Sequence, residues 1–186
     1  MTYKNLKKHL LKNNISDNKT FFDLMLLRIK SKIILCVGEY ACNTASFLSS
    51  VMETSKIQHS HYVHSDDIEL KDRFLSSISN AEVSDLALKA YNLFKRAQGT
   101  LSNDELLFLL ALKLLDGKDE YLILEVPTDF YINSLSSLDL SIYALILCFF
   151  DDEKSQKCIS LAPQSAKLLF GISYPMIAKG LGKAPV

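Results

Sequence analysis

The chain has 186 residues, of which 48% are hydrophobic and 23% are charged, and this composition is typical of a folded domain with a core. Its 21 basic and 21 acidic residues balance, so nothing in the net charge favours nucleic-acid binding. No apolar run is long enough to span a bilayer, and the lysine-rich N-terminus lacks the apolar segment of a secretory signal. The 4 cysteines form no C-x-x-C pair, which favours reduced thiols in a cytoplasmic protein.

The first 31 residues are predicted to form two helices, Tyr3–Lys12 and about Thr20–Lys30, because apolar residues in the second recur at helical spacing. A continuous apolar run, Lys32–Gly38, predicts a strand that is buried on both faces and ends at a glycine turn. The turn Glu39–Asn43 is expected to lead into a helix over Thr44–Thr54. Residues 32–186 are therefore predicted to form one α/β domain after the N-terminal helices.

The rest of the chain continues to alternate between the two kinds of element. Capping boxes at Ser79/Glu82 and Ser102/Glu105 predict helices to about Gln98 and Asp116. The second of these is apolar on nearly all sides, which is typical of a buried helix, and Gly117 suits its end. The remaining predictions are a less buried strand within Ile57–His64, strands at Glu120–Val126, Ser141–Cys148 and Cys158–Leu161, and helices at Ser165–Phe170 and Pro175–Leu181.

Strands that alternate with helices predict a mainly parallel sheet with helices on both faces. We expect Ile33–Val37, Tyr121–Val126 and Tyr143–Cys148 to be parallel neighbours in that sheet, because all three are unbroken apolar runs. Ligands of such sheets bind at the carboxyl ends of the strands. The sequence therefore directs attention to the turn after Gly38 and to the end of the strand that contains Glu125.

Four segments resemble the Mur ligase superfamily, and most closely its folylpolyglutamate synthase family. They are Val37–Leu48 in the place of the family's G-T-N-G-K-G-S-T loop, Ser60–Val63 in the place of T-S-P-H-L, the apolar helix of Thr100–Leu115, and Tyr121–Val126 in the place of Y-A-V-L-E-V. The resemblance covers about Lys32–Asp151 and includes no counterpart of the family's separate C-terminal ligase domain. It implies a P-loop-like Mur ligase central-domain fold.

The resemblance also implies a site for ATP and magnesium, because the family makes an acyl phosphate from ATP and joins glutamate to a folate. Carried over by motif, Gly38, Asn43 and Thr44 would hold the nucleotide, and Glu125 would hold the metal. It assigns no catalytic residue. Whether ATP and magnesium are the cofactors depends on whether this inherited site still works.

The phosphate loop looks eroded in this sequence. A phosphate loop uses glycines, a helix N-terminus and a lysine, but no lysine or arginine occurs between Lys32 and Lys56. Glu39 adds a negative charge where the phosphates would lie. We therefore expect a degenerate domain without normal ATP-dependent ligase activity, acting in binding or assembly, either as a homo-oligomer or with a partner protein.

Two alternatives remain open from the sequence. The chain is a working ATP-dependent amide ligase fragment if a missing domain or a partner completes it. It is a small cysteine-dependent hydrolase if Cys42, placed before a helix N-terminus that lowers its pKa, acts with His61 or His64 as base. His59, His61 and His64 lie on one segment. In a strand His64 would point away from the other two, so the binding of one metal ion by all three side chains would be strained.

Overall fold

The computed structural model describes residues 29–64, 73–75, 79, 81–82, 84–85, 88, 103–137, 140–149, 152–161 and 168–173. The predicted helices at 3–12 and 175–181 lie outside these residues, as do most of 20–30 and of 79–98. Ile29 and Lys30, the last residues predicted for the second helix, are not helical. The capping box at Ser79 and Glu82 is confirmed, because the Ser79 N–H and hydroxyl both donate to the Glu82 carboxylate at 2.8 Å.

The described strands form one sheet in the order β3-β2-β4-β1-β5-β6. Their bounds are β1 Lys32–Val37, β2 His59–Tyr62, β3 Phe74–Leu75, β4 Tyr121–Val126, β5 Ile142–Phe149 and β6 Leu168–Ser173. All neighbours are parallel except the short edge strand β3, which runs antiparallel to β2. The prediction that β1, β4 and β5 are parallel neighbours is therefore confirmed, with β1 in the middle.

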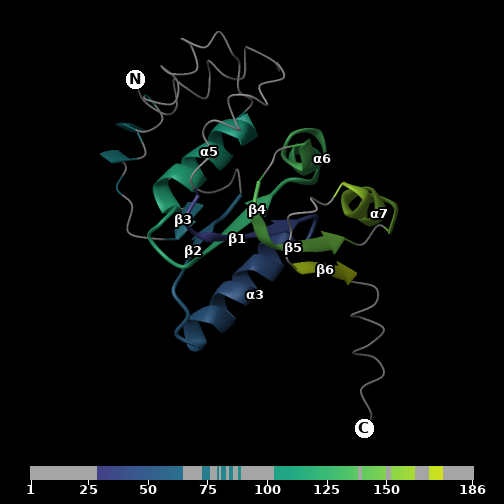
Figure 1. Cartoon of the computed structure of the whole chain (residues 1–186), viewed down its shortest axis with the longest axis horizontal. Helices are drawn as coiled ribbons and strands as arrows, with labels where there is room; N and C mark the ends of the chain where they lie inside the picture. The colour runs from purple at the N-terminus through teal and green to yellow at the C-terminus, as the bar shows by residue number, and fades with distance from the viewer. Residues whose placement is uncertain are drawn as a thin grey trace.

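Helices cover both faces of this sheet, as predicted (Figure 1). Helix α3 (Ala41–Thr54) lies on one face, and α5 (Asn103–Leu115), α6 (Thr128–Asn133) and α7 (Asp152–Ser160) lie on the other, with the short 3-10 helix η2 (Leu135–Ser137) after α6. Residues of β1 alternate between two cores, Ile34 and Cys36 on the α3 side and Ile33, Leu35 and Val37 on the other. Burial on both faces explains why β1 is apolar at every position from Ile33 to Val37.

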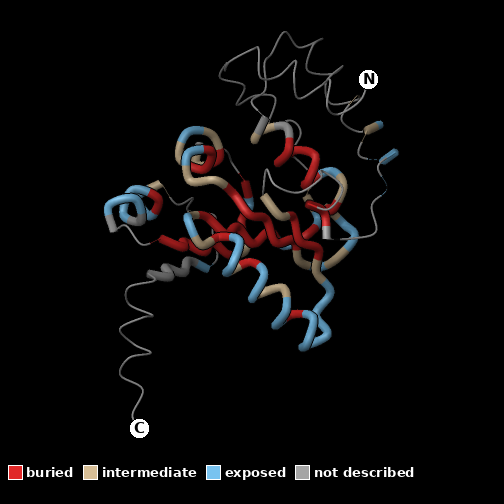
Figure 2. Tube along the Cα trace, turned by 180° about the vertical axis from the view of Figure 1, so that it is seen from behind, coloured by how far each residue is buried: buried red, intermediate tan, exposed pale blue. Residues whose placement is uncertain are grey.

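Helix α5 supplies most of the core on its side of the sheet. Its residues from Leu107 to Leu112 are at most 2% exposed, which confirms the prediction of a buried helix. The helix is followed by Gly117, whose φ of +76° is the left-handed conformation that a glycine adopts at little cost. Figure 2 shows the buried residues concentrated along the strands, whereas the outer side of α3 is exposed.

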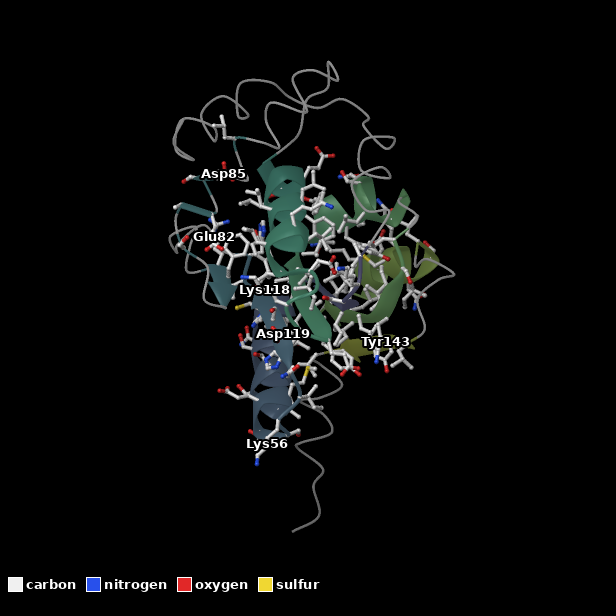
Figure 3. The ribbon with its side chains drawn as sticks, turned by 60° about the vertical axis from the view of Figure 1, so that its left-hand side comes forward. Lys56, Glu82, Asp85, Lys118, Asp119 and Tyr143 are labelled. Atoms are coloured by element: carbon white, nitrogen blue, oxygen red, sulfur yellow. The ribbon has the colours of Figure 1, made fainter. Side chains whose placement is uncertain are left out.

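The segment before β1 is fastened to the connection between α5 and β4. The Asp116 carboxylate accepts the N–H groups of Lys30 and Ser31 at 2.8 and 2.9 Å. Asp119, labelled in Figure 3, accepts the Ser60 hydroxyl of β2 at 2.5 Å. These contacts fix the amino ends of β1 and β2 against β4 and so hold the three strands in register.

Three predictions about individual elements are wrong. Cys158 lies in α7 rather than in a strand. Of the side chains that the structure describes in this helix, Cys158 alone is buried and the others are exposed, which is typical of a surface helix. Leu168–Phe170 belongs to β6 rather than to a helix, because it pairs with β5. Strand β2 is not less buried, since Ser60, His61 and Tyr62 are each 1% exposed.

None of the helices in the described part of the chain is long and apolar enough to cross a membrane.

Candidate functional site

The connection between β1 and α3 is shorter than the sequence suggested. The helix begins at Ala41 rather than at Thr44, so only Gly38, Glu39 and Tyr40 separate strand from helix. The Tyr40 N–H donates to the Cys148 carbonyl at 3.2 Å, and the Ala41 N–H donates to the Gly38 carbonyl at 3.1 Å. Two of the backbone donors that a phosphate loop would offer to its ligand are thus used within the fold.

Gly38 is required by packing against the neighbouring strand. Its φ is +125°, and a Cβ added to it would lie 2.2 Å from the Cys148 carbonyl oxygen of β5. Real Cβ atoms do not approach other atoms so closely, so any side chain would push the connection away from β5. The close approach to β5 accounts for the glycine without any ligand.

The two other residues carried over for the nucleotide lie in the first turn of α3. Asn43 is exposed, whereas Thr44 is partly buried and its hydroxyl lies near the Cys148 thiol. Burial raises the pKa of that thiol, and the Thr44 contact opposes this effect. The Thr44 hydroxyl is therefore on the side of α3 toward β5, although the family resemblance assigned Thr44 to the nucleotide.

Glu125 lies at the carboxyl end of β4, and the pairing of Val126 with Val37 brings it beside Gly38, as the sequence predicted. Its side chain is only 2% exposed. One carboxylate oxygen accepts the His61 Nε2–H at 2.9 Å, and the other accepts the His64 backbone N–H at 3.0 Å. The carboxylate thus has the partners within the fold that a buried charge needs.

The three histidines of the β2 segment have separate partners. His59 contacts the Ser49 hydroxyl of α3 through Nε2 at 2.7 Å and the Ile57 carbonyl through Nδ1 at 2.9 Å. His61 is 1% exposed and bonds to Glu125, and the His64 ring lies 3.7 Å from an Asp104 oxygen. Among the described residues, no group of three His, Cys, Asp or Glu side chains is arranged to hold a metal ion.

Cys42 is exposed at the first turn of α3, where its thiol lies near the Glu125 carboxylate and the Ser46 hydroxyl. Partial burial and the Glu125 charge raise the pKa of the Cys42 thiol. The sequence predicted the opposite direction from the helix N-terminus alone. The prediction of a lowered pKa is wrong because burial, and after it the nearby carboxylate, disfavour a thiolate.

One charged residue near the connection was missed by the sequence analysis. Lys154 of α7 places its ammonium group 3.4 Å from the Glu39 carboxylate, across a separation of 115 residues. Both side chains are about half exposed, at 53% and 43%. Lys154 belongs to a polar helix, and nothing in the local sequence indicates that it reaches the end of β1.

Taken together, the contacts around the connection do not fit a phosphate loop that holds magnesium nucleotide. The connection has no lysine of its own, the Thr44 hydroxyl lies near the Cys148 thiol, and Glu125 is engaged by His61 and His64. The predicted assignment of Gly38, Asn43 and Thr44 to a nucleotide and of Glu125 to a metal stays a prediction.

No family model and no curated protein sequence matches the chain. Solved structures do match. The Thermotoga maritima folylpolyglutamate synthase is similar with a TM-score of 0.70 and 11% identity over 95% of this chain and 46% of that one. The Helicobacter pylori folylpolyglutamate synthetase is similar with a TM-score of 0.66 and 18% identity, over 96% of this chain and 49% of that one. The Yersinia pestis bifunctional folylpolyglutamate synthase/dihydrofolate synthase, solved with AMPPNP and a Mn ion, is similar with a TM-score of 0.66 and 15% identity, over 91% of this chain and 50% of that one.

At these identities the likeness concerns the fold, and the chain spans about half the length of the solved chains that it matches. The parallel order β2-β4-β1-β5 with α3 directly after β1 is the part of the fold that carries the connection and Glu125. The resemblance drawn from the sequence motifs is thus supported by an independent comparison of structures. This chain has the α/β fold of the folylpolyglutamate synthase structures that it matches.

Proposed function

We propose that this chain is a degenerate folylpolyglutamate synthase-like domain that lacks normal ATP-dependent ligase activity and acts in binding or assembly. The observation that carries the proposal is the engagement of the inherited site by its own fold. Thr44 contacts Cys148, and Glu125 is held by His61 and His64. The family resemblance assigned Thr44 to the nucleotide and Glu125 to the metal.

Energetics support the proposal. Freeing Glu125 for a metal would break hydrogen bonds to a charged group, each worth roughly 1.5–3 kcal/mol. Glu39 would repel a phosphate by roughly 1–4 kcal/mol at about 4 Å, depending on the local dielectric, and the attraction of a loop lysine is missing. Since about 1.4 kcal/mol changes a dissociation constant tenfold, these effects together move a micromolar nucleotide site to the millimolar range or beyond.

Calorimetric titration of the full chain with magnesium ATP tests the proposal. We expect no saturable binding up to about 1 mM nucleotide. A micromolar dissociation constant would overturn it. Thermal melting of the Thr44→Val variant then locates any binding, because loss of a nucleotide-dependent shift in that variant would assign the nucleotide to the β1–α3 connection.

The active-ligase alternative has one observation in its favour. The Lys154 ammonium brings a positive charge to within 3.4 Å of Glu39, which is the charge that the connection itself lacks. If the chain is an ATP-dependent amide ligase fragment, ADP release at millimolar magnesium ATP should be measurable and should fall in Lys154→Gln. Under our proposal neither protein releases ADP above the rate of the uncatalysed reaction.

Two further observations bear on the setting of the proposed role. All 4 cysteines are free, which agrees with our expectation of a cytoplasmic protein.

On α3, Phe47 is 72% exposed and Val51, one turn later on the same face, is 43% exposed. This apolar face supports assembly with a partner protein or a second copy, and light scattering after gel filtration, compared with Phe47→Ser, tests the second-copy case.

A further inference from the structure

The outer face of α3 is exposed and carries no charged side chain (Figure 2). We define it by the exposed residues that point away from the sheet, namely Asn43, Ser46, Phe47, Ser50, Val51 and Thr54. Helical spacing places them opposite Ala41, Ala45 and Met52, which are buried against the sheet. Phe47 is 72% exposed, so its ring is the main apolar group that this face presents to the solvent.

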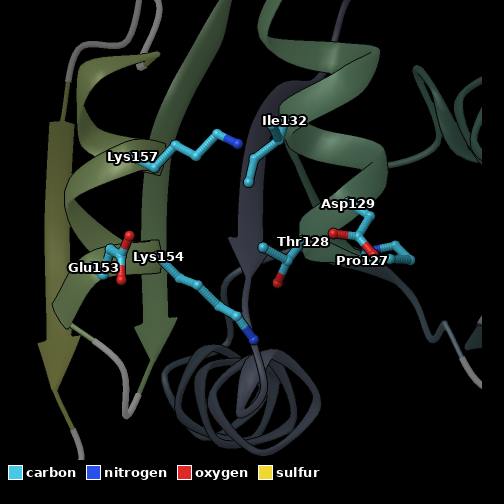
Figure 4. A pocket seen from close by; sticks show the side chains of 7 residues that line it. All are labelled: Pro127, Thr128, Asp129, Ile132, Glu153, Lys154 and Lys157. Carbon is cyan, nitrogen blue, oxygen red and sulfur yellow. The ribbon is translucent and has the colours of Figure 1, made fainter.

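The helices on the other side of the sheet carry charged residues on their exposed surfaces. Figure 4 shows the pocket of about 560 Å³ between α6 and α7, whose lining includes Asp129, Glu153, Lys154 and Lys157. Charged side chains are depleted from the centres of protein interfaces, because they lose their water there. The α3 face has only uncharged side chains to desolvate, so it is the better suited of the two surfaces to contact another protein.

Hydroxyl groups on the α3 face already have partners within the helix. The Ser50 hydroxyl donates to the Ser46 carbonyl at 2.9 Å, and the Thr54 hydroxyl donates to the Ser50 carbonyl at 2.8 Å. Burying a hydroxyl is costly when it loses its hydrogen bond, and these two keep theirs when a partner excludes water. The face therefore offers a partner the Phe47 ring, the Val51 methyl groups and the carbon atoms of small side chains.

Four residues of the α3 face follow the spacing of a seam between two helices. They recur at steps of four, three and four residues, which is the spacing by which paired helices pack along their length: Asn43, Phe47, Ser50 and Thr54. A second copy of this chain is a suitable partner by charge, because its own α3 face is equally uncharged. The 21 basic and 21 acidic residues of each copy also balance, so two copies carry no net charge that would keep them apart.

The α3 face is also complementary to itself in the size of its side chains. When two copies of α3 run antiparallel, with a two-fold axis at the middle of the seam, Phe47 lies opposite Ser50 of the partner subunit. Val51 then lies opposite Ser46 of the partner subunit, so each large side chain meets a small one. The two remaining residues of the face pair at the ends of the seam, where their polar groups stay near water.

We propose that the α3 face is the contact surface of a homodimer, in which two copies of this chain pack antiparallel α3 helices about a two-fold axis. Two-fold dimers are the commonest homo-oligomers, and both copies contribute the same patch to such an interface. The proposal rests on the assembly role proposed above and names the partner as a second copy. A helix of 14 residues is about 21 Å long, so the contact is small and the expected dissociation constant is roughly 10 µM to 1 mM.

Sedimentation equilibrium of the full chain, from about 10 µM to 1 mM, measures this association. A reducing agent is present, because the exposed Cys42 thiol crosslinks copies when it is oxidised. We expect a monomer–dimer equilibrium, and Phe47→Ser should raise the dissociation constant about tenfold or more, because a central aromatic side chain carries much of the energy of an interface. Ile159→Ser is the matched control, since Ile159 is an exposed apolar residue of α7, and it should dimerise like wild type. Far-UV circular dichroism checks that both variants are folded.

Variants of Ser50 test the two-fold arrangement itself. The Ser50 side chains of the two copies lie close to the axis, so Ser50→Glu and Ser50→Lys should each weaken dimerisation about tenfold or more through repulsion between like charges. An equimolar mixture of these two variants should associate, because opposite charges then face each other across the axis. This rescue requires that the same face of both copies forms the contact.

The proposal is overturned if the chain stays monomeric up to about 1 mM, if Phe47→Ser dimerises like wild type, or if the mixture of Ser50 variants fails to associate. Equal weakening by Ile159→Ser and Phe47→Ser would also overturn it. Its failure is distinct from that of the loss of ATP chemistry. A monomeric chain that binds no magnesium ATP contradicts the homodimer alone, whereas a dimer that binds magnesium ATP with micromolar affinity contradicts the degenerate nucleotide site alone.

Discussion

Replacing Gly38 by alanine separates a packing requirement from a ligand-binding one. The structure places two costs on this substitution. A non-glycine residue at a φ of +125° is strained by roughly 1–3 kcal/mol. In addition, the new Cβ would lie 2.2 Å from the Cys148 carbonyl oxygen, so the connection must move away from β5.

That movement has its own energetic consequence. The Tyr40 N–H donates to the same Cys148 carbonyl at 3.2 Å, and separating the two groups leaves them without their partner. Leaving a buried polar group unsatisfied costs roughly 1–3 kcal/mol. Adding the backbone strain, we expect Gly38→Ala to lower the free energy of unfolding by roughly 2–6 kcal/mol.

Urea denaturation followed by far-UV circular dichroism measures this change, since the chain has no tryptophan to report by fluorescence. Gly117→Ala is the matched control, because Gly117 also has a positive φ, +76°, but among the described residues its added Cβ would meet only the Lys30 Cδ at 3.5 Å. We expect Gly117→Ala to lower the free energy of unfolding by roughly 1–2 kcal/mol, from backbone strain alone. Equal losses in the two variants would refute the argument that the contact with β5 makes Gly38 necessary.

Four further predictions follow from the burial and contacts of single side chains. Leu109→Ala should destabilise the protein by about 2–5 kcal/mol, because Leu109 is 1% exposed in α5; a loss below about 0.5 kcal/mol in the same assay would contradict this. Glu125→Gln should lower the free energy of unfolding by roughly 1–3 kcal/mol, because an amide side chain cannot accept from both His61 and the His64 N–H. Magnesium ATP should shift the melting temperature of neither the wild type nor this variant. A shift in the wild type alone would give the carboxylate a binding role. Cys42 should be the thiol that Ellman's reagent reaches first in the folded protein, yet at pH 8 it should react more slowly than free cysteine because its pKa is raised, and Cys42→Ser should remove that phase; a faster reaction would favour a cysteine nucleophile. Burial raises the pKa of Tyr131 from 10.0 to about 12, so between these pH values the unfolded chain loses a phenol proton that the folded state keeps. The contribution of Tyr131 to the free energy of unfolding is therefore fully present below pH 10 and is lost as the pH rises toward 12. If Tyr131→Phe leaves the dependence of stability on pH unchanged in this range, the assignment is contradicted.

Much of the fold followed from the amino-acid pattern because the pattern is local. Ile33–Val37 is apolar at every position, and a strand with helices on both sides has no exposed face on which polar residues would be favourable. The apolar residues around all sides of α5 indicated its burial for the same reason, and Gly117 marked its end. The same local pattern indicated that Gly38 and Glu125 finish adjacent parallel strands.

The chemistry of the site was decided by contacts between residues distant in the chain. His61 and Glu125 are 64 positions apart, and Lys154 and Glu39 are 115 apart, so no spacing rule relates them. The start of α3 was also decided by a contact between distant residues. Thr44 suits a helix cap by residue type, but α3 begins at Ala41, directly after the Tyr40 N–H donates to the Cys148 carbonyl of β5. Sequence alone thus determined the central strands β1, β4 and β5 and the helices α3 and α5 through their hydrophobic patterns. Tertiary structure alone decided which polar groups are already engaged, because hydrogen-bond partners and neighbouring charges depend on how the strands and helices are brought together.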